Sequence, residues 1–486
     1  MDKALPFKSQ KTYARVAKNQ MENFMTRKLN LFSLFTLLFF VSMCVSPNLL
    51  AQTKNPKESK LDAYLSNLSD NERMMTAVYI SQHGETLYEY YSGFASVEDN
   101  IPLSAKTEFR LGSISKIFTS ILIMQLIEEG KLSLETKLST FYPDIPNAES
   151  ITVKQLLSHR TGIQSFTDEP AYVNYMTKGQ SRKQMEQRIQ SYDPLFKPNS
   201  KHQYSNSNYV LLGFIIESLR EKSYAEVVSE KITIPLGLAN TYFGNSIEIE
   251  NNEVFSYRFS DTWERQPETH MSVSHAAGGM VSTAKETNLF LSALFAGKLL
   301  SENSLSAMMT LEDGYGLGLF STPFYKQTFF GHNGSIDGFV SAVGFNPVDG
   351  IVVTVLSNGV NYNFNDVLIA VLSNNYGKDF TIPDFSAKPV VLSAKAMGRT
   401  VGTFSSKDMP IELSFRVADK QVMYKPAGQS EKSLTPYSET EFRFEPAGIV
   451  IQFDPQSLTD GKLNQFDITQ SGYKFLYKRK EKNWFW

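Results

Sequence analysis

The stretch Phe109-Arg110-Leu111-Gly112-Ser113-Ile114-Ser115-Lys116 opens a long apolar run, IFTSILIMQLIEEG, that ends at Gly130. Apolar residues cover nearly the whole circumference of this run at helical spacing, which predicts a buried helix. Ser113 and Lys116 are three residues apart and therefore lie on one face of it. Backbone N–H groups are free at a helix start and favour negative charge. A serine there can attack a carbonyl while its own N–H helps to hold the oxyanion.

The S-x-x-K pattern alone does not identify a nucleophile, because it occurs three times: at Ser113, Ser282 and Ser471. The second copy is explained by a capping box, in which Thr283 and Glu286 begin a helix. The third copy lies in a strand-like segment. Taken by itself, Ser113 fits an ordinary helix cap as well as it fits a nucleophile.

Two further motifs lie at positions in the chain where their side chains could take part in catalysis. Tyr204-Ser205-Asn206 comes just before a second apolar helical run, and His332-Asn333-Gly334 comes before two strands predicted at residues 339–345 and 351–356. Tyr172-Val173-Asn174 also has the Y-x-N form, but it lies in an irregular stretch, so Tyr204 is the favoured tyrosine. His159 ends a short helix and is expected to bond its own loop rather than to take part in catalysis.

With these three motifs in this order, residues 60–380 resemble the penicillin-recognising serine hydrolases. The resemblance is to the class C β-lactamase-like branch, which includes D-Ala-D-Ala carboxypeptidases, D-aminopeptidases and esterases. Residues 156–162 and 315–318 also resemble family segments. The implied fold class is α/β (α+β): an antiparallel sheet flanked by helices plus a helical subdomain. His332 stands where class C β-lactamases have lysine, as in the carboxypeptidase and aminopeptidase members.

The resemblance implies an acyl transfer in two steps, through a covalent acyl-enzyme that water then hydrolyses. Ser113 would be the acylated nucleophile, and Lys116 would lie beside it. Tyr204 would exchange the proton with Ser113 and with the leaving group, helped by Lys116 and His332. Whether the tyrosine or the lysine is the base stays open.

The resemblance also implies how the substrate binds. Asn206 would orient Lys116 and bond the substrate amide, and the backbone N–H of Ser335 would complete the oxyanion hole. Gly334 would let the substrate lie close to the strand, and His332 would help to bind it. No metal or organic cofactor is implied. The expected partner is a small-molecule or peptide substrate. The net charge of −2 does not indicate the basic surface that binding to nucleic acid needs.

The N-terminus predicts export to the periplasm or cell envelope. Basic residues precede the apolar run 29–45, and Leu49-Leu50-Ala51 could precede a cleavage site. An uncleaved membrane anchor is the alternative, because the run is nearly long enough to span a bilayer. Residues 1–20 look unlike a signal sequence, so initiation at Met21 or Met25 is considered. Cys44 is the only cysteine and a candidate lipidation site, and a chain cleaved after it could form no disulfide.

The predicted domains are an N-terminal extension with signal peptide (1–51), the hydrolase domain (52–385) and a small all-β domain (386–486). From Val401 onward, short alternating segments are separated by Gly, Pro, Asp and Asn, which predicts strands and turns.

The favoured function is that of a secreted serine hydrolase acting on ester or peptide substrates, including ones that contain D-amino acids. A β-lactamase proper and a catalytically silent penicillin- or muropeptide-binding protein are the alternatives.

Overall fold

The computed structural model describes residues 56–470 and 473–480. Contacts divide the chain into two compact units: Met75–Gly359 forms the first, and residues 56–74 join the chain after Gly359 in the second. The predicted signal peptide and Cys44 lie outside the described residues. No helix within the described part is long and apolar enough to span a membrane. The predicted boundary at residue 385 stays a prediction.

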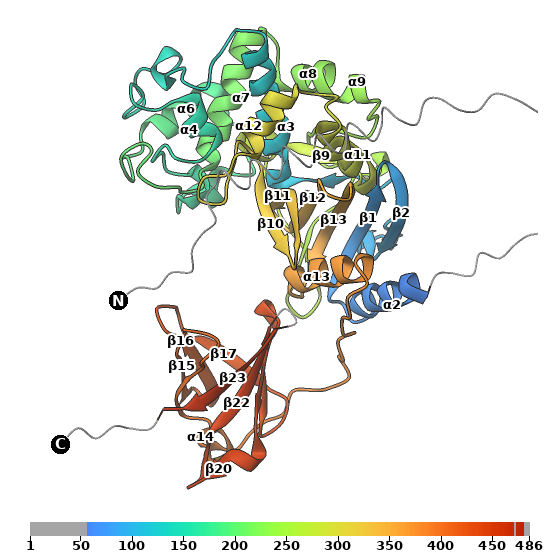
Figure 1. Cartoon of the computed structure of the whole chain (residues 1–486), viewed down its shortest axis with the longest axis vertical. Helices are drawn as coiled ribbons and strands as arrows, with labels where there is room; N and C mark the ends of the chain where they lie inside the picture. The colour runs from blue at the N-terminus through green and yellow to red at the C-terminus, as the bar shows by residue number, and fades with distance from the viewer. Residues whose placement is uncertain (1–55, 471–472, 481–486) are drawn as a thin grey trace, which may run out of the picture. The chain divides into compact units, whose positions relative to one another are not determined.

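The first unit is built on a mixed sheet in the order β10-β11-β12-β13-β1-β2 (Figure 1), with β7 joined to β13 and β8 to β7. The ladders from β10 to β13 and from β1 to β2 are antiparallel, and β7 pairs with β13 in parallel. The turn between β1 and β2 has positive φ at His83 and Gly84, as a tight hairpin requires. The strands are β1 (Met74–Gln82), β2 (Glu85–Ser92), β7 (Tyr257–Phe259), β8 (Trp263–Arg265), β10 (Phe320–Phe324), β11 (Gln327–Ile336), β12 (Phe339–Phe345) and β13 (Ile351–Val360).

The predicted buried helix of this unit is α3 (Ser115–Glu128). Its side chains are buried on every side, and Gly130 takes φ +72° just beyond its end. The second apolar run forms α7 (Asn206–Arg220), which packs against α3. The other helices are α4 (Val153–Leu157), α5 (Tyr172–Tyr175), α6 (Arg182–Gln190), α8 (Tyr224–Val228), α9 (Ile234–Leu236), α10 (Met271–Gly278), α11 (Ala284–Phe295) and α12 (Glu302–Met309). The short strands are β3 (Phe94–Ser96), β4 (Ile101–Pro102), β5 (Phe109–Arg110), β6 (Tyr242–Phe243) and β9 (Met280–Ser282).

Two local expectations differ from the structure. The His332 motif lies inside strand β11 instead of before the strands. The glycines of Tyr315–Leu319 suit a strand that another backbone approaches closely, which predicts a strand there, but the segment is a loop. Gly318 has φ +80° there, and a Cβ on Gly316 would lie 2.1 Å from the Met308 carbonyl oxygen, so the chain is held in a tight turn.

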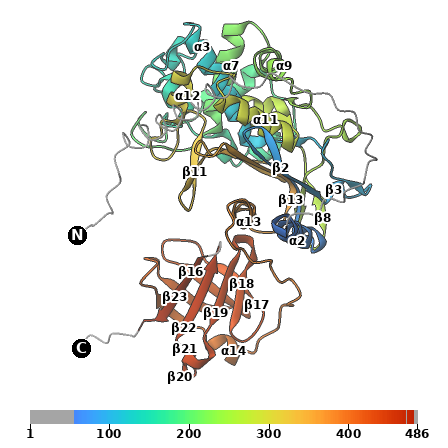
Figure 2. The same cartoon turned by 45° about the vertical axis from the view of Figure 1, so that its right-hand side comes forward.

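The C-terminal all-β region of the second unit is a closed barrel in the order β14-β15-β16-β17-β18-β19-β22-β23, part of which Figure 2 shows face on. Aromatic rings fill it, among them Phe404, Phe415, Phe453 and Phe466 with centroids 5.0–5.9 Å apart. The strands are β14 (Gly402–Ser405), β15 (Leu413–Ala418), β16 (Gln421–Pro426), β17 (Lys432–Pro436), β18 (Glu441–Phe444), β19 (Ile449–Phe453), β20 (Leu458–Thr459), β21 (Lys462–Leu463), β22 (Gln465–Gln470) and β23 (Tyr473–Arg479). The helices of this unit are α2 (Pro56–Asp70), α13 (Phe364–Asn375), which packs on α2, and α14 (Ala394–Gly398).

Candidate active site

Ser113 lies in a short 3-10 turn (Gly112–Ile114) just before α3, and strand β11 packs directly against this turn. A Cβ on Gly112, which has φ +54°, would lie 2.8 Å from the Ser335 backbone nitrogen. A Cβ on Gly334 would lie 2.0 Å from the Leu111 carbonyl oxygen. Both positions therefore need glycine if the strand is to approach the serine. Gly334 has this packing role within the protein, and the close approach of a substrate to it stays a prediction.

Lys116 is fully buried, and its ammonium group has three hydrogen-bond acceptors. The Nζ atom lies 3.0 Å from Ser113 Oγ, 2.8 Å from Asn206 Oδ1 and 2.7 Å from the Ala277 carbonyl oxygen. Burial lowers the pKa of Lys116 well below its usual value, because the charged form is taken out of water. The amine is therefore easier to deprotonate than a surface lysine while it stays in contact with the serine.

The hydroxyl of Tyr204 is buried and has no hydrogen-bond partner among the described residues. Burial raises its pKa, and the nearby Ser113 hydroxyl works against this shift without forming a hydrogen bond of good geometry. Lys116 Nζ lies 4.9 Å from the centroid of the tyrosine ring. Tyr204 is thus a protonated phenol next to both Ser113 and Lys116.

The amide of Asn206 is held in one orientation at the first residue of α7. Its Oδ1 accepts from Lys116, and its Nδ2 donates to Thr167 Oγ1 at 3.0 Å. Ser205 is the N-cap residue. If Asn206 Nδ2 is to bond a substrate amide, as the resemblance implies, the bond to Thr167 must be shared or broken. Thr167 was not singled out from the sequence, because no motif marks it.

His332 is buried, and its imidazole makes two hydrogen bonds. Nε2 lies 2.9 Å from the Tyr315 hydroxyl, and Nδ1 bonds the Asn333 carbonyl. Burial, with a smaller contribution from Lys116, lowers the pKa of His332 to about 3. The ring is therefore neutral at ordinary pH and offers no permanent positive charge to a substrate.

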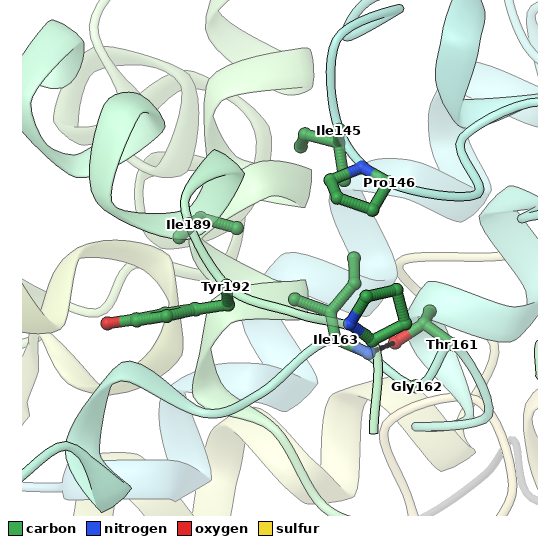
Figure 3. Close-up of a pocket in the computed structure, with 8 residues that line it drawn as sticks. Ile145, Pro146, Thr161, Gly162, Ile163, Ile189 and Tyr192 are labelled. Atoms are coloured by element: carbon green, nitrogen blue, oxygen red, sulfur yellow. Dashed lines mark hydrogen bonds between the residues drawn. The ribbon is translucent and has the colours of Figure 1, made fainter. Parts of the chain in front are cut away.

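Ser113, Asn206 and Ser335 open onto a cavity of about 570 Å³. That volume suits a small molecule or the end of a peptide. Apolar and polar side chains form its wall: Phe166, Thr167, Tyr172, Val173, Met176, Thr177, Arg258, Gln266, Pro267, Thr269, Ser274, Ala277, Gly278, Ile336 and Asp337. A second hollow of about 10 Å³, lined in part by Ile145, Ile163 and Tyr192 (Figure 3), has room for about one water molecule. It shares no lining residue with the larger cavity.

The structure also shows where the alternative candidates for the catalytic tyrosine and serine lie. Tyr172 lies in the cavity wall with its hydroxyl 3.4 Å from Thr269 Oγ1, whereas Tyr204 lies beside Lys116. Ser282 is buried and bonds Thr241. Ser471 lies outside the described residues. Within the described ranges, no group of three or more His, Cys, Asp or Glu side chains is placed to hold a metal ion.

His159 does not bond its own loop as expected. Its Nδ1 accepts from the Ser205 backbone N–H at 3.1 Å, and its Nε2 lies 3.3 Å from the Tyr315 hydroxyl. The sequence contained one signal for this arrangement: residues 156–162 and 315–318 both resemble family segments, although no role could be assigned to either.

The family model "Beta-lactamase" matches residues 61–375, so the chain belongs to the β-lactamase family of serine hydrolases. It is 24% identical to penicillin-binding protein 4* of Bacillus subtilis (strain 168), over 82% of this chain and 94% of the relative. It is 26% identical to a teichoic acid D-alanine hydrolase of Staphylococcus aureus, over 67% of this chain and 82% of that protein.

Two solved structures have a fold similar to that of this chain. The D-amino acid amidase of Ochrobactrum anthropi SV3, complexed with L-phenylalanine amide, has a TM-score of 0.60 and 25% identity, covering 66% of this chain and 99% of that one. The octameric penicillin-binding protein homologue of Pyrococcus abyssi has a TM-score of 0.62 and 23% identity, covering 86% of this chain and 99% of that one. The β-lactamase-type fold followed by an all-β domain, predicted from the sequence, is confirmed.

Proposed function

We propose that this chain is an exported serine hydrolase that cleaves ester or peptide substrates, including D-amino-acid derivatives, through an acyl-enzyme on Ser113. The observation that carries the proposal is the ammonium of Lys116, which lies between Ser113 Oγ at 3.0 Å and Asn206 Oδ1 at 2.8 Å. Export is part of the proposal and is supported by the apolar run at residues 29–45.

In the first step, Ser113 Oγ attacks the substrate carbonyl carbon, and its proton passes to Lys116 or Tyr204. The oxyanion meets the backbone N–H groups of Ser113 and Ser335, which the close approach of β11 brings together. Collapse breaks the ester or amide bond, and the leaving group takes up the proton. Water then attacks the acyl-enzyme, which releases the acid and restores the Ser113 hydroxyl.

Two observations favour ester and amide substrates over β-lactams. His332 is neutral and buried where class C β-lactamases have a permanently charged lysine, so binding of a lactam carboxylate has less support. One relative is named as a D-alanine hydrolase and one solved structure as a D-amino acid amidase, which supports a D-amino-acid acyl group.

The test compares wild type with Ser113→Ala and Ser282→Ala. Ser282 is the matched control, because it is a serine of the same S-x-x-K form that is buried and bonded to Thr241. Turnover of p-nitrophenyl esters and D-amino-acid amides should fall about a thousandfold or more in Ser113→Ala and stay near wild type in Ser282→Ala. A fluorescent fluorophosphonate should label every form except Ser113→Ala.

Three results would contradict the proposal. Labelling that persists in Ser113→Ala would place the nucleophile elsewhere. A kcat/KM for nitrocefin about a hundredfold above that for the best ester would make the chain a β-lactamase proper. Binding of labelled penicillin with no turnover of any substrate would favour the silent binding protein.

A further inference from the structure

Three residues from distant parts of the sequence meet behind the Tyr204 ring: His159, Tyr315 and His332. His159 follows α4, Tyr315 lies in the loop after α12, and His332 is in β11. All three are buried. The ring centroids of His159 and His332 lie 4.2 Å and 6.2 Å from that of Tyr204, and that of Tyr315 lies 6.3 Å from it. Neither His159 nor Tyr315 lines the active-site cavity, and both lie next to the Tyr204 ring.

The partners of the two imidazoles specify which nitrogen of each carries the proton. His332 Nδ1 faces the Asn333 carbonyl, which can only accept, so Nδ1 is protonated and Nε2 is a bare acceptor. His159 Nδ1 faces the Ser205 N–H, which can only donate, so Nδ1 is bare and Nε2 is protonated. The two rings are therefore opposite tautomers.

Tyr315 supplies the group that both of these tautomers need. Its hydroxyl accepts from His159 Nε2–H at 3.3 Å and donates to His332 Nε2 at 2.9 Å. A hydroxyl can do both at once, whereas a side chain that only donates or only accepts would satisfy one ring. Reversing either link would leave a buried polar group without a partner, which is costly. The hydrogen bonds thus form one continuous chain from Ser205 to Asn333.

We propose that Tyr315 is a positioning residue whose hydroxyl holds His159 and His332 in one pair of tautomers behind Tyr204, so that neither imidazole takes up the proton of the acyl transfer. This inference rests on the proposed function. It adds that proton exchange is confined to Ser113, Lys116 and Tyr204.

The electrostatic surroundings support this role. Burial lowers the pKa of both imidazoles, to about 3 for His332, and Lys116 acts in the same direction on each. The other titratable side chains facing the two rings are His202, Tyr204 and Tyr209, next to His159. No carboxylate among the described residues forms an ion pair with either ring.

The loop that carries Tyr315 is tied to the His159 segment through Arg160. The Arg160 guanidinium pairs with Asp313, lies 3.2 Å from Glu312 and donates from Nε to Asn199 Oδ1 at 2.9 Å. Because Arg160 directly follows His159, these contacts hold Tyr315 at a fixed distance from the imidazole.

The first test reads the tautomers directly and needs no substrate. Imidazole ¹⁵N spectra of the full chain, with His159 and His332 assigned through His159→Gln and His332→Gln, should show His159 protonated at Nε2 and His332 at Nδ1. Neither ring should titrate between about pH 6 and 9. A wild-type spectrum with His332 protonated at Nε2, or with either ring as an imidazolium at pH 7, would overturn the proposal even if a variant at Tyr315 did not fold.

The second test compares Tyr315→Phe with Tyr224→Phe, a buried tyrosine whose hydroxyl bonds Thr119 at 2.7 Å outside this chain of bonds. Tyr315→Phe should lower kcat about tenfold with KM changed less than about twofold, because two buried imidazole nitrogens lose their partner. In its ¹⁵N spectrum the signals of the Nε2 nitrogens of both rings should move from their wild-type positions, because each nitrogen loses its hydrogen-bond partner. Tyr224→Phe should change neither kcat nor these signals.

Equal kcat and equal ¹⁵N signals of His159 Nε2 and His332 Nε2 in the two variants would overturn the proposal. Failure of the proposed function is a separate result: it would be seen as wild type that a fluorophosphonate does not label at Ser113, whatever the ¹⁵N spectra show.

Discussion

Lys116 has three hydrogen-bond partners, and only one of them can donate a proton to it. The Ala277 carbonyl oxygen and Asn206 Oδ1 are acceptors, whereas Ser113 Oγ carries a hydrogen. When the amine loses its charge, which burial favours, Ser113 is the partner that can turn its hydroxyl toward Nζ. The geometry therefore supports Lys116 as the first acceptor of the serine proton, with Tyr204, whose pKa is raised, as the donor to the leaving group.

The lowered pKa of His332 predicts how stability depends on pH. Its pKa is about 3 in the folded chain and near 6.5 when unfolded, so between these values the unfolded chain binds more protons. The free energy of unfolding should therefore fall as pH drops from about 6.5 towards 3. His332→Gln, in which a side-chain oxygen can still accept from Tyr315, should show a shallower fall in urea titrations at pH 7, 5.5 and 4. An equal or steeper fall in the variant would show that His332 does not carry this dependence.

At the level of single residues, the sequence predicted the side chains that the structure brings together around Ser113. Each of them opens a helix or lies in a short motif. Thr167 and the partners of His159 could not be predicted in this way. Their contacts join segments 39 and 46 residues apart, and such pairings are set by the packing of α4 and of the 3-10 turn Phe166–Asp168 on α7.

Strand β11 is the element that brings the rest of the site to the nucleophile. It pairs with β12 in a regular antiparallel ladder and packs on the turn that holds Ser113. Gly334 allows this contact, since its α-carbon faces both the Leu111 carbonyl and Ser341 Oγ. The Ser341 hydroxyl also donates to the Leu111 carbonyl at 2.8 Å, which fixes the position of the turn.

Gly334→Ala should therefore impair both stability and catalysis. The added Cβ would lie 2.0 Å from a backbone oxygen, so β11 must shift, and we expect a loss of about 1–3 kcal/mol in the free energy of unfolding. Because the shift moves the Ser335 N–H away from the oxyanion, kcat should fall about a hundredfold. Gly398→Ala, where a Cβ meets nothing within 4 Å, is the control for both assays. Wild-type kcat in Gly334→Ala would contradict this role.

How well each strand or loop was predicted depended on the pattern of its side chains. Strand β12 begins and ends at the predicted residues, 339 and 345, because apolar residues dominate the run between clear turns. Strand β11 was not predicted, because His332, Asn333 and Gly334 look like a loop, and only pairing with β12 makes them a strand. The loop at Tyr315 was missed because glycine suits both a close strand contact and a tight turn.

At the scale of the whole molecule, two hydrophobic cores of the described residues lie in separate regions of the chain. One lies around α3 and includes the stacked rings of Phe118 and Phe290, with centroids 3.7 Å apart. The other fills the barrel around Phe404. Because each core is complete in itself, each can unfold cooperatively by itself.

Calorimetry of the full chain should therefore resolve two unfolding transitions. Phe404→Ala should lower the midpoint of one and Phe118→Ala that of the other, each through a loss of about 3–5 kcal/mol. Loss of activity on heating should follow the transition that Phe118→Ala moves. A single transition shifted by both substitutions would show that the two cores unfold as one.

The closure of the barrel also bears on aggregation. A closed barrel has no edge strand, whereas the hydrolase sheet ends at β10 and at β2, where backbone groups could recruit a strand from another molecule. β10 carries Pro323, which lacks the donor that a growing sheet needs, and β2 carries the exposed carboxylates Glu85 and Glu89, which repel a second copy of themselves. Fibre-like growth is thus discouraged at the β10 and β2 edges of the hydrolase sheet.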